Sequence, residues 1–420
     1  MGLRILIVND FYPPFIGGAE RQVQLLSRSL VRRGHQVDVA TIWHAGLSEQ
    51  QDDCGVRVHR LKALTTRVGW FSKDARRRFH PPFPDLAVVL ELRNLISRIK
   101  PDIVNAGGWI AYSCAAALLG NRTPLVLSAR DYGYTCAVRT LLYHGQICAG
   151  PAPVKCIECA SRSYGLPKAL AAVAGVLGLR GLLRRKISAV HSVSTFVEAI
   201  VRRDLSAGQD EAPAAGNASR PDVVIPGFLI AEPEAGSIQE FLGQLPEKPF
   251  ILFVGALRPH KGLAVLLAAY GQISSPPPLV LIGSVWPDTP ENFPSGVVVL
   301  RDAPHPVVMA AWDRCLFGVA PSVWPDPSPG VIKEAMSKGK AVIASNIGGM
   351  LDLVIHDETG LFVPPGDVDL LAAALQQLID HPDRRERMGR LAQKRAKIYS
   401  SEAAVPQFEH LFQLLVDDAQ

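Results

Sequence analysis

The chain has 420 residues, of which 48% are hydrophobic and 20% charged, and its formal net charge at pH 7 is +5. This length exceeds what a single hydrophobic core usually supports, so we expect two domains, and the composition excludes a disordered or fibrous chain. The modest positive charge suits a phosphate-bearing ligand or an anionic membrane surface, but it is too small to indicate nucleic acid.

The N-terminal residues, MGLRILIVNDFYPP, contain an apolar run that is too short for a secretory signal and that fits a strand better. No stretch reaches the roughly 18 uncharged apolar residues of a membrane-spanning helix. The nearest approach, residues 166–187, is interrupted by Lys168 and Arg180. Seven cysteines are too few for a secreted disulfide scaffold. We therefore expect a cytoplasmic protein, with peripheral attachment to the inner face of the membrane as an option.

Strand and helix patterns alternate along the first half of the chain. Residues 4–10 form a short aliphatic run typical of a buried parallel strand. A Pro/Gly loop follows, and then a helix whose apolar residues share one face. Gly34 is placed to end this helix, and residues 37–41 form the next strand. A polar, Gly/Ala/Pro-rich segment at 206–222 indicates a surface loop before the last strand of this half.

The same alternation restarts at Pro249 and continues to the C-terminal region. We therefore predict an α/β protein with two doubly wound, Rossmann-like domains, residues 1–226 and 227–399. The last segment, residues 400–420, has an apolar face that is predicted to pack back on the first domain. This face consists of Val405, Phe408, Leu411, Phe412 and Leu415.

In open α/β sheets, ligands bind at the carboxyl ends of the strands, which points to the loops that follow them. The loop with Gly17 and Gly18 precedes a helix and could bring backbone N–H groups close to an anion, or it could simply be a mobile connection. After the strand that begins the second half, Arg258 and Lys261 follow Gly255 at the start of a helix. Two cations there fit a diphosphate, although either alone could be a solvated surface residue.

The segment PSVWPDPSPGVIKEAM places Asp326 in a rigid, proline-rich loop and Glu334 in the helix that follows it. The first backbone amides of that helix, those of Gly330, Val331 and Ile332, would be open to an anion. Either acid alone could be a helix cap or a solvated residue. Together they predict an element that holds a phosphate between two carboxylates.

These motifs, in this order and over nearly the whole chain, resemble the retaining glycosyltransferases of family 4, which have the GT-B fold. The family's E-x7-E motif corresponds here to Asp326 and Glu334. The resemblance implies an acceptor-binding first domain and a second domain that binds a nucleoside diphosphate sugar. It implies that Lys261 and Arg258 hold the diphosphate, Glu334 the ribose and Asp326 the sugar. The loop with Gly17 and Gly18 would close over the diphosphate, and no catalytic divalent metal is expected.

The sequence departs from the family pattern at four places. The first motif acid is Asp326 instead of Glu, and Ala256 stands where the family often has an arginine. The stretch VLSARDYGY resembles the family's T-x-H-D-Y-W, but Arg130 replaces the histidine near the reaction centre, whereas Asp131 is retained. Arginine cannot act as a base near neutral pH, but it could bind an acceptor phosphate or the donor diphosphate. Asn105 likewise replaces a histidine of the family.

Four cysteines, Cys136, Cys148, Cys156 and Cys159, fall within 24 residues. Four thiolates can bind zinc tetrahedrally, so a structural metal is one interpretation, and free or packed thiols are the other. Two basic segments, residues 73–83 and 179–187, could lie on anionic lipid or could be ordinary surface elements.

Three functions remain open from the sequence. The first is transfer of a sugar to a saccharide, lipid-linked or small-molecule acceptor. The second is a non-catalytic partner that only binds sugar nucleotides, an interpretation suggested by Arg130. The third is a sugar-nucleotide epimerase of the same fold. The first predicts loss of turnover when Lys261 or Glu334 is replaced.

Overall fold

The computed structural model describes residues 2–15, 17–67, 79–205, 221–229 and 239–419. The chain divides into two compact units: unit 1 comprises residues 1–226 and 404–420, and unit 2 comprises residues 227–403. Each unit has its own sheet. Most of the polar segment predicted as a surface loop at 206–222, and of the basic segment at 73–83, lies outside the described residues.

Unit 1 is built on an eight-stranded sheet with the order β10-β9-β6-β5-β1-β2-β4-β3. The pairings are parallel except for β3 with β4. The chain runs outward from β1 through β2 to β4, and then restarts at β5 on the other side of β1. The switch point therefore lies between β1 and β5. The strands are β1 Arg4–Asn9, β2 Gln36–Ile42, β3 Gln50–Asp53, β4 Val56–Leu61, β5 Ile103–Gly107, β6 Leu125–Ala129, β9 Ala189–Ser192 and β10 Asp222–Val224.

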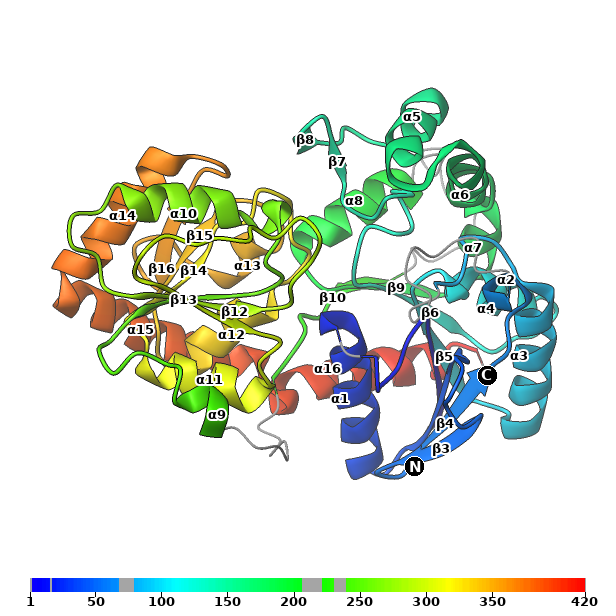
Figure 1. Cartoon of the computed structure of the whole chain (residues 1–420). Helices are drawn as coiled ribbons and strands as arrows, with labels where there is room; N and C mark the ends of the chain where they lie inside the picture. The colour runs from blue at the N-terminus through cyan, green and yellow to red at the C-terminus, as the bar shows by residue number, and fades with distance from the viewer. Residues whose placement is uncertain (1, 16, 68–78, 206–220, 230–238, 420) are drawn as a thin grey trace. The chain divides into compact units, whose positions relative to one another are not determined.

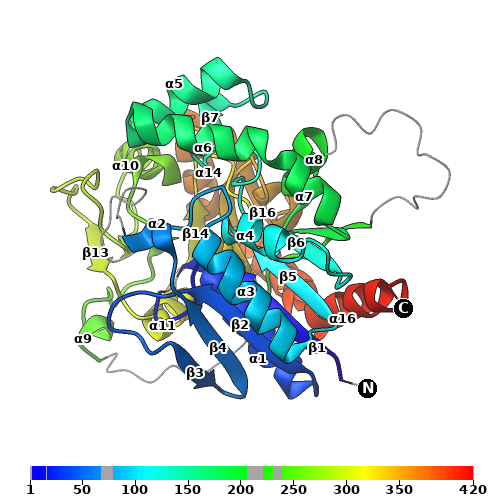
Figure 2. The ribbon, with the colours of Figure 1, turned by 90° about the vertical axis from the view of Figure 1, so that its right-hand side faces the viewer.

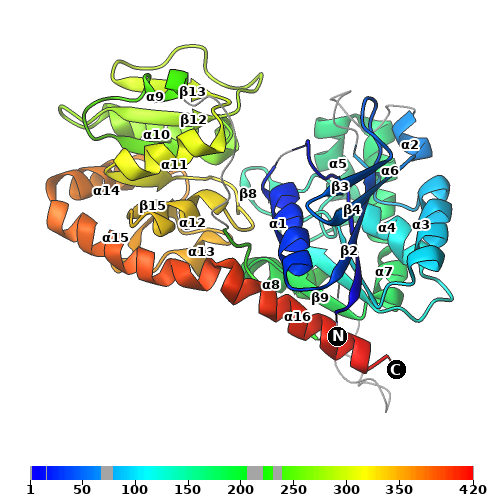
Figure 3. The ribbon, with the colours of Figure 1, turned by 90° about the horizontal axis from the view of Figure 1, so that it is seen from below.

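Helices cover both faces of this sheet. Helix α1 lies on one face, and α3, α4 and α7 lie on the opposite face (Figure 3). Helices α5 and α6 pack side by side (Figure 2). The helices are α1 Gly18–Arg32, α2 Leu64–Arg67, α3 Leu86–Ile99, α4 Ile110–Ala117, α5 Pro153–Tyr164, α6 Leu166–Gly178, α7 Arg180–Lys186 and α8 Thr195–Leu205, and a hairpin pairs β7 Leu142–Tyr143 with β8 Gln146–Ile147.

The C-terminal helix α16, Ser401–Asp417, returns to unit 1 as predicted. All five residues of its predicted apolar face are buried. At its surface, Glu409 accepts hydrogen bonds from Arg33, at 2.7 Å, and lies 2.9 Å from His35 at the end of α1. Apolar burial therefore fixes this helix, and the ion pair orients it.

Unit 2 has a parallel six-stranded sheet with the order β13-β12-β11-β14-β15-β16. Its switch point lies between β11 and β14. Two buried clusters fill the two faces of the sheet: α10 and α14 cover one face, and α11, α12 and α15 the other (Figure 1). The elements are α9 Gln239–Leu242, β11 Ile251–Val254, η1 Pro259–Lys261, α10 Leu263–Gly271, β12 Leu279–Gly283, β13 Val297–Arg301, α11 His305–Arg314, β14 Phe317–Ala320, α12 Gly330–Ser337, β15 Val342–Ser345, α13 Met350–Leu353, β16 Gly360–Val363, α14 Val368–Asp380, α15 Pro382–Ala396 and η2 Lys397–Tyr399.

One helical stretch of the described chain, Leu166–Lys186, is long and apolar enough to cross a membrane by length and composition alone. This is the same segment that the sequence showed as the nearest approach, interrupted by Lys168 and Arg180. The stretch comprises α6 and α7, and a Cβ on Gly175 would lie 2.4 Å from the carbonyl oxygen of Pro82. Such close backbone packing is typical of a helix that belongs to the fold of a domain.

Candidate functional site

Two loops of unit 2 meet at the switch point of its sheet. One follows β11 and carries Lys261, and the other follows β14 and leads into α12. The amide of Val323 donates a hydrogen bond of 3.0 Å to the carbonyl of His260. Gly262 has a φ of +77°, and a Cβ there would lie 1.8 Å from the carbonyl oxygen of Pro321. Only glycine allows this approach, so the local sequence is built to hold the two loops together.

Lys261 and Asp326 form the central contact between these loops. The Lys261 Nζ lies 2.5 Å from the Asp326 Oδ2, and it also lies 5.2 Å from the centre of the Trp324 ring. Asp326 is 7% exposed, and its backbone carbonyl accepts a hydrogen bond of 2.7 Å from Gly349. The sequence predicted both residues separately. The structure shows that they form one ion pair at the place where ligands bind in such sheets.

Glu334 lies on α12 and is held by α11. Its Oε1 is 3.0 Å from the Nε2 of His305, and its Oε2 accepts a hydrogen bond of 3.3 Å from the indole N–H of Trp312. The two motif acids therefore have separate partners. Asp326 contacts the loop after β11, and Glu334 contacts α11. His305 and Trp312 were not predictable from the sequence, because nothing local links α11 to α12.

A third charged residue of the motif, Lys333, was missed. It is 2% exposed, and its Nζ donates a hydrogen bond of 3.0 Å to the hydroxyl of Ser328. Burial lowers the pKa of Lys333 to about 8, against the opposing charges of Asp326 and Glu334. The signal in the sequence was its position between the two motif acids.

The start of α12 has the residues that the sequence analysis placed near an anion. No side chain caps the helix, and Pro329 occupies its N-cap position. Gly330 is exposed, Val331 is half-buried and Ile332 is buried. The amides of the first turn have no intrahelical partners, and they lie beside the loop that carries Asp326. They can therefore donate hydrogen bonds to an anion.

Arg258 is held differently from Lys261. Its Nε and Nη2 lie 3.2 and 3.1 Å from the Oδ2 of Asp288, and its guanidinium stacks over the Trp286 ring at 4.6 Å. The loop before it turns at Gly255, which has a φ of +150°. Sequence reasoning treated Arg258 and Lys261 as one pair of cations, but only Lys261 contacts the motif.

In unit 1, the switch point holds a buried carboxylate, Asp10, which the sequence-based prediction omitted. Its Oδ1 and Oδ2 accept hydrogen bonds from the amides of Ile110 and Trp109, at 2.7 and 3.0 Å. Arg139 donates a further hydrogen bond of 3.1 Å to Asp10. Burial disfavours the charge on Arg139, but Asp131 and Asp10 outweigh this and raise its pKa. This cluster fixes the N-terminus of α4 against the end of β1.

Arg130 and Asp131 follow β6 directly, next to the same switch point. The Oδ1 of Asp131 accepts a hydrogen bond of 2.8 Å from Gly133, and its Oδ2 lies 3.6 Å from Arg139. Burial lowers the pKa of Arg130 to about 10, which is still high enough to keep the guanidinium charged at pH 7. Asn105, the other departure from the family pattern, accepts a hydrogen bond of 2.7 Å from Ser128 and is buried.

Gly17 and Gly18 form the N-terminal end of α1. Gly17 is the N-cap residue, with extended backbone and no side-chain cap. A Cβ on Gly18 would meet no atom within 4 Å. No packing among the described residues therefore requires glycine at this position.

The four clustered cysteines of unit 1 line one small cavity of about 20 Å³, together with Lys155. Burial and the neighbouring thiols raise the pKa of Cys159. Within the described residues, no group of three or more His, Cys, Asp or Glu side chains is arranged to hold a metal ion. The structure therefore gathers the four thiols but does not arrange them as a coordination shell.

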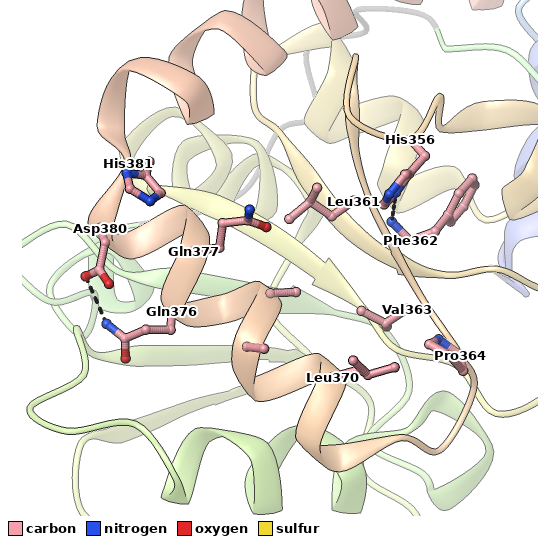
Figure 4. Close-up of a pocket in the computed structure, with 12 residues that line it drawn as sticks. His356, Leu361, Phe362, Val363, Pro364, Leu370, Gln376, Gln377, Asp380 and His381 are labelled. Carbon is pink, nitrogen blue, oxygen red and sulfur yellow. Dashed lines mark hydrogen bonds between the residues drawn. The ribbon is translucent and has the colours of Figure 1, made fainter.

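A larger depression, of about 560 Å³, lies at the edge of the unit 2 sheet between β16 and α14 (Figure 4). It is lined mainly by apolar residues, with His356, Gln377 and His381 at its margin. His356 accepts a hydrogen bond of 2.9 Å from the amide of Phe362. None of the sequence-predicted site residues lines it, so this depression is separate from the switch-point site.

Two family models match the chain. "Glycosyl transferase 4-like domain" matches residues 17–217, and "Glycosyl transferases group 1" matches residues 237–395. The first match falls within unit 1 and the second within unit 2, and together they span most of the chain.

One similar protein is the D-inositol 3-phosphate glycosyltransferase of Corynebacterium efficiens, 30% identical over 39% of this chain and 42% of that protein. The matches with the first curated relatives thus span less than half of those proteins. Among solved structures, the sucrose-phosphate synthase of Thermosynechococcus elongatus has a TM-score of 0.71 and 20% identity, over 99% of this chain and all of that one. Anabaena HepE in complex with UDP-glucose has a TM-score of 0.64 and 18% identity, over 98% and 99%. The chain belongs to the group 1, family 4-like glycosyltransferases, with the GT-B fold.

Proposed function

We propose that this protein is a retaining glycosyltransferase that moves a sugar from a nucleoside diphosphate sugar to a saccharide, lipid-linked or small-molecule acceptor. The observation that carries the proposal is the Lys261–Asp326 ion pair beside the open start of α12, at the switch point of unit 2. The family membership supports it, and so does the UDP-glucose complex of the structurally similar HepE.

In this proposal Lys261 and the first amides of α12, from Gly330 to Ile332, bind the diphosphate. Lys261 then exchanges part of its contact with Asp326 for contact with phosphate oxygens. Glu334 accepts hydrogen bonds from the ribose hydroxyls while His305 and Trp312 keep its carboxylate in place. Arg258 adds positive charge at longer range, because Asp288 and Trp286 already hold its guanidinium.

The chemistry follows from where charge develops. Breaking the bond between sugar and phosphate builds negative charge on the leaving diphosphate and positive charge on the ring. A fixed ammonium group and aligned backbone amides stabilise the leaving group, because they need no reorganisation during the reaction. Asp326, which is buried and negatively charged beside them, can stabilise the ring or orient its hydroxyls. The loop with Gly17 and Gly18 would contribute further amides to the diphosphate.

The test is turnover of UDP-glucose, GDP-mannose and ADP-glucose by the full chain, with the product's anomeric configuration read by NMR. Transfer or slow hydrolysis that gives a product of unchanged configuration supports the proposal. An inverted product contradicts retention. Binding without turnover would favour the non-catalytic partner, and a changed sugar on intact nucleotide would favour the epimerase. Full activity in excess chelator is expected, since we predict no catalytic divalent metal.

Two further expectations stay predictions with their own tests. A structural zinc on the four cysteines requires about one metal per chain by elemental analysis of purified protein, and loss of metal in Cys156→Ser. The second expectation is a cytoplasmic protein attached to the inner face of the membrane. Its attachment requires that the protein float with anionic vesicles. In the second basic segment, Arg184 donates a hydrogen bond of 3.4 Å to the carbonyl of Asp204 and Lys186 one of 2.5 Å to that of Asn121, which leaves Arg185 as its exposed arginine.

A further inference from the structure

Arg130 lies at the carboxyl end of the unit 1 sheet, where its guanidinium rests against the backbone of β5. Its Nη1 is 2.8 Å from the position that a Cβ on Gly107 would occupy. Asn9, at the end of β1, has its Oδ1 at the same distance from that position. The guanidinium therefore reaches from β6 across β5 toward β1, and so toward the switch point where ligands bind in such sheets.

Arg130 makes no hydrogen bond or ion pair in the part of the chain that the structure describes, although Tyr134, Glu20 and Asp131 act on its charge from nearby. Burial is the main cause of its lowered pKa, and Tyr134, Glu20 and Asp131 offset that effect only in part. Asp131 is already engaged by the amide of Gly133 and by Arg139. Burying a cation without a directly bonded anion costs free energy, and buried cations are therefore normally paired.

Two features near the switch point favour an anion: the Arg130 guanidinium and the uncapped start of α1. Glu20 is in the first turn of α1, so its influence on Arg130 places the start of that helix nearby. That start has no side-chain cap, and α1 has fifteen residues, long enough for a helix dipole. The positive end of this helix favours a phosphate near Arg130, and the guanidinium fork can donate two hydrogen bonds to that phosphate.

We propose that Arg130 binds a phosphate group of the acceptor, so that the acceptor is a phosphorylated or phosphate-linked sugar. This inference rests on the proposed function, because it assigns the acceptor to unit 1. It explains why an arginine can stand where the family pattern has a histidine. A charge-assisted, two-pronged contact selects for the phosphate, whereas a neutral acceptor would leave the buried cation unmatched.

The experiment is calorimetry on the full chain with four kinds of probe: inorganic phosphate and pyrophosphate, glucose 1-phosphate and glucose 6-phosphate, glucose and glucuronate, and UDP. We expect at least one phosphate-bearing probe to bind at least tenfold more tightly than glucose and glucuronate. Arg130→Gln should remove that preference, and Arg130→Lys should keep part of it. The UDP dissociation constant should stay within about twofold in both variants.

Lys261→Ala is the matched variant for the other unit. It should weaken UDP binding and leave the binding of the phosphate probe unchanged, so the two sites can fail separately. Loss of UDP binding in Arg130→Gln, with the phosphate probe unaffected, would assign Arg130 to the donor diphosphate and overturn the proposal. Tighter binding of glucuronate, or no binding of any phosphate probe at about 10 mM, would also overturn it. Failure of UDP alone to bind the wild type would contradict the proposed function instead.

Discussion

The carboxyl ends of the two sheets hold their charges in different ways. In unit 2, Lys261 is paired with Asp326, and Arg258 is paired with Asp288. In unit 1, Arg139 is paired with Asp10 in the same manner, but Arg130, nine positions earlier, has no partner among the described residues. The cations of unit 2 are thus in direct ion pairs without a ligand, whereas Arg130 has only the more distant charges of Glu20 and Asp131.

This difference indicates two modes of anion binding. A paired lysine must share or exchange its carboxylate when a phosphate arrives, which couples the binding of the diphosphate to the position of Asp326. An unpaired arginine gains its first counter-ion from the ligand, so the ligand removes a cost already present in the free protein. The predictions below break or sharpen this contrast.

The largest effect is expected for Lys261→Ala. Without the ammonium group, turnover of the donor should fall about 100- to 1,000-fold, because a fixed positive charge on the leaving group is lost. Asp326 would also lose its partner, which should cost about 2 kcal/mol of stability. The matched control is Lys338→Ala, which removes a lysine paired with Asp313 at the surface. If both variants retain wild-type turnover, Lys261 does not bind the diphosphate.

The two arginines of unit 1 should differ in stability. Arg139→Leu leaves Asp10 buried without its cation and should cost about 3 kcal/mol, a fall in melting temperature of several degrees. Arg130→Leu removes a cation that has no partner, and it should change stability by less than about 0.5 kcal/mol or raise it. The measurement is the melting temperature of both variants without ligand, relative to the wild type. Equal destabilisation would show that Arg130 already has a structural counter-ion.

Glu334→Gln should weaken donor affinity about tenfold, since a neutral amide replaces the carboxylate that accepts from the ribose. His305 and Trp312 would retain one acceptor, so the fold should persist. The titration is calorimetric, with the nucleoside diphosphate that binds the wild type. Glu386→Gln on α15, a mostly exposed acid, is the control and should bind normally. An unchanged dissociation constant in Glu334→Gln would remove this residue from the ribose site.

Lys333 predicts a pH dependence of stability. Burial lowers its pKa to about 8 in the folded chain, from an ordinary value of 10.5. Between these two values the unfolded chain binds more protons than the folded chain, so this group makes the free energy of unfolding rise with pH. The slope from one group is at most just over 1 kcal/mol per pH unit.

The measurement compares urea unfolding of the wild type with that of Lys333→Met between about pH 7 and pH 10.5. The difference in the free energy of unfolding between the two proteins should change above about pH 8 and stay constant below it. Lys338→Met, at the end of the same helix, should follow the wild type. Parallel curves for wild type and Lys333→Met would mean that Lys333 is not held charged in a buried site.

The order of strands and helices could be predicted from the sequence because aliphatic runs and helical periodicity are local signals. Local signals also pointed to Lys261 and Asp326, in loops that follow recognisable strands, and to Glu334, in the helix after Asp326. The partners of these residues were not predictable. Asp288, His305 and Trp312 come from other elements, and only the fold brings them to Arg258 and Glu334. Local spacing carries no information about such contacts.

Lys333 and Asp10 show a second reason why some residues could not be predicted from the sequence. Both are charged residues that the fold buries, and a sequence pattern normally assigns charge to the surface. Gly262 shows a third, because its place after Lys261 looks like a simple helix boundary. In the structure it allows two loops to touch, and the Lys261–Asp326 contact depends on that approach.

The central claim is that charges at the switch point of unit 2 bind a nucleoside diphosphate. The most direct measurement is calorimetric titration of UDP, GDP and ADP into the full chain and into Lys261→Ala. We predict that at least one of them binds the wild type and binds the variant at least tenfold more weakly, with the melting temperature of the variant above the temperature of the titration. Equal affinity for wild type and variant, or no binding of any of the three, would contradict the account.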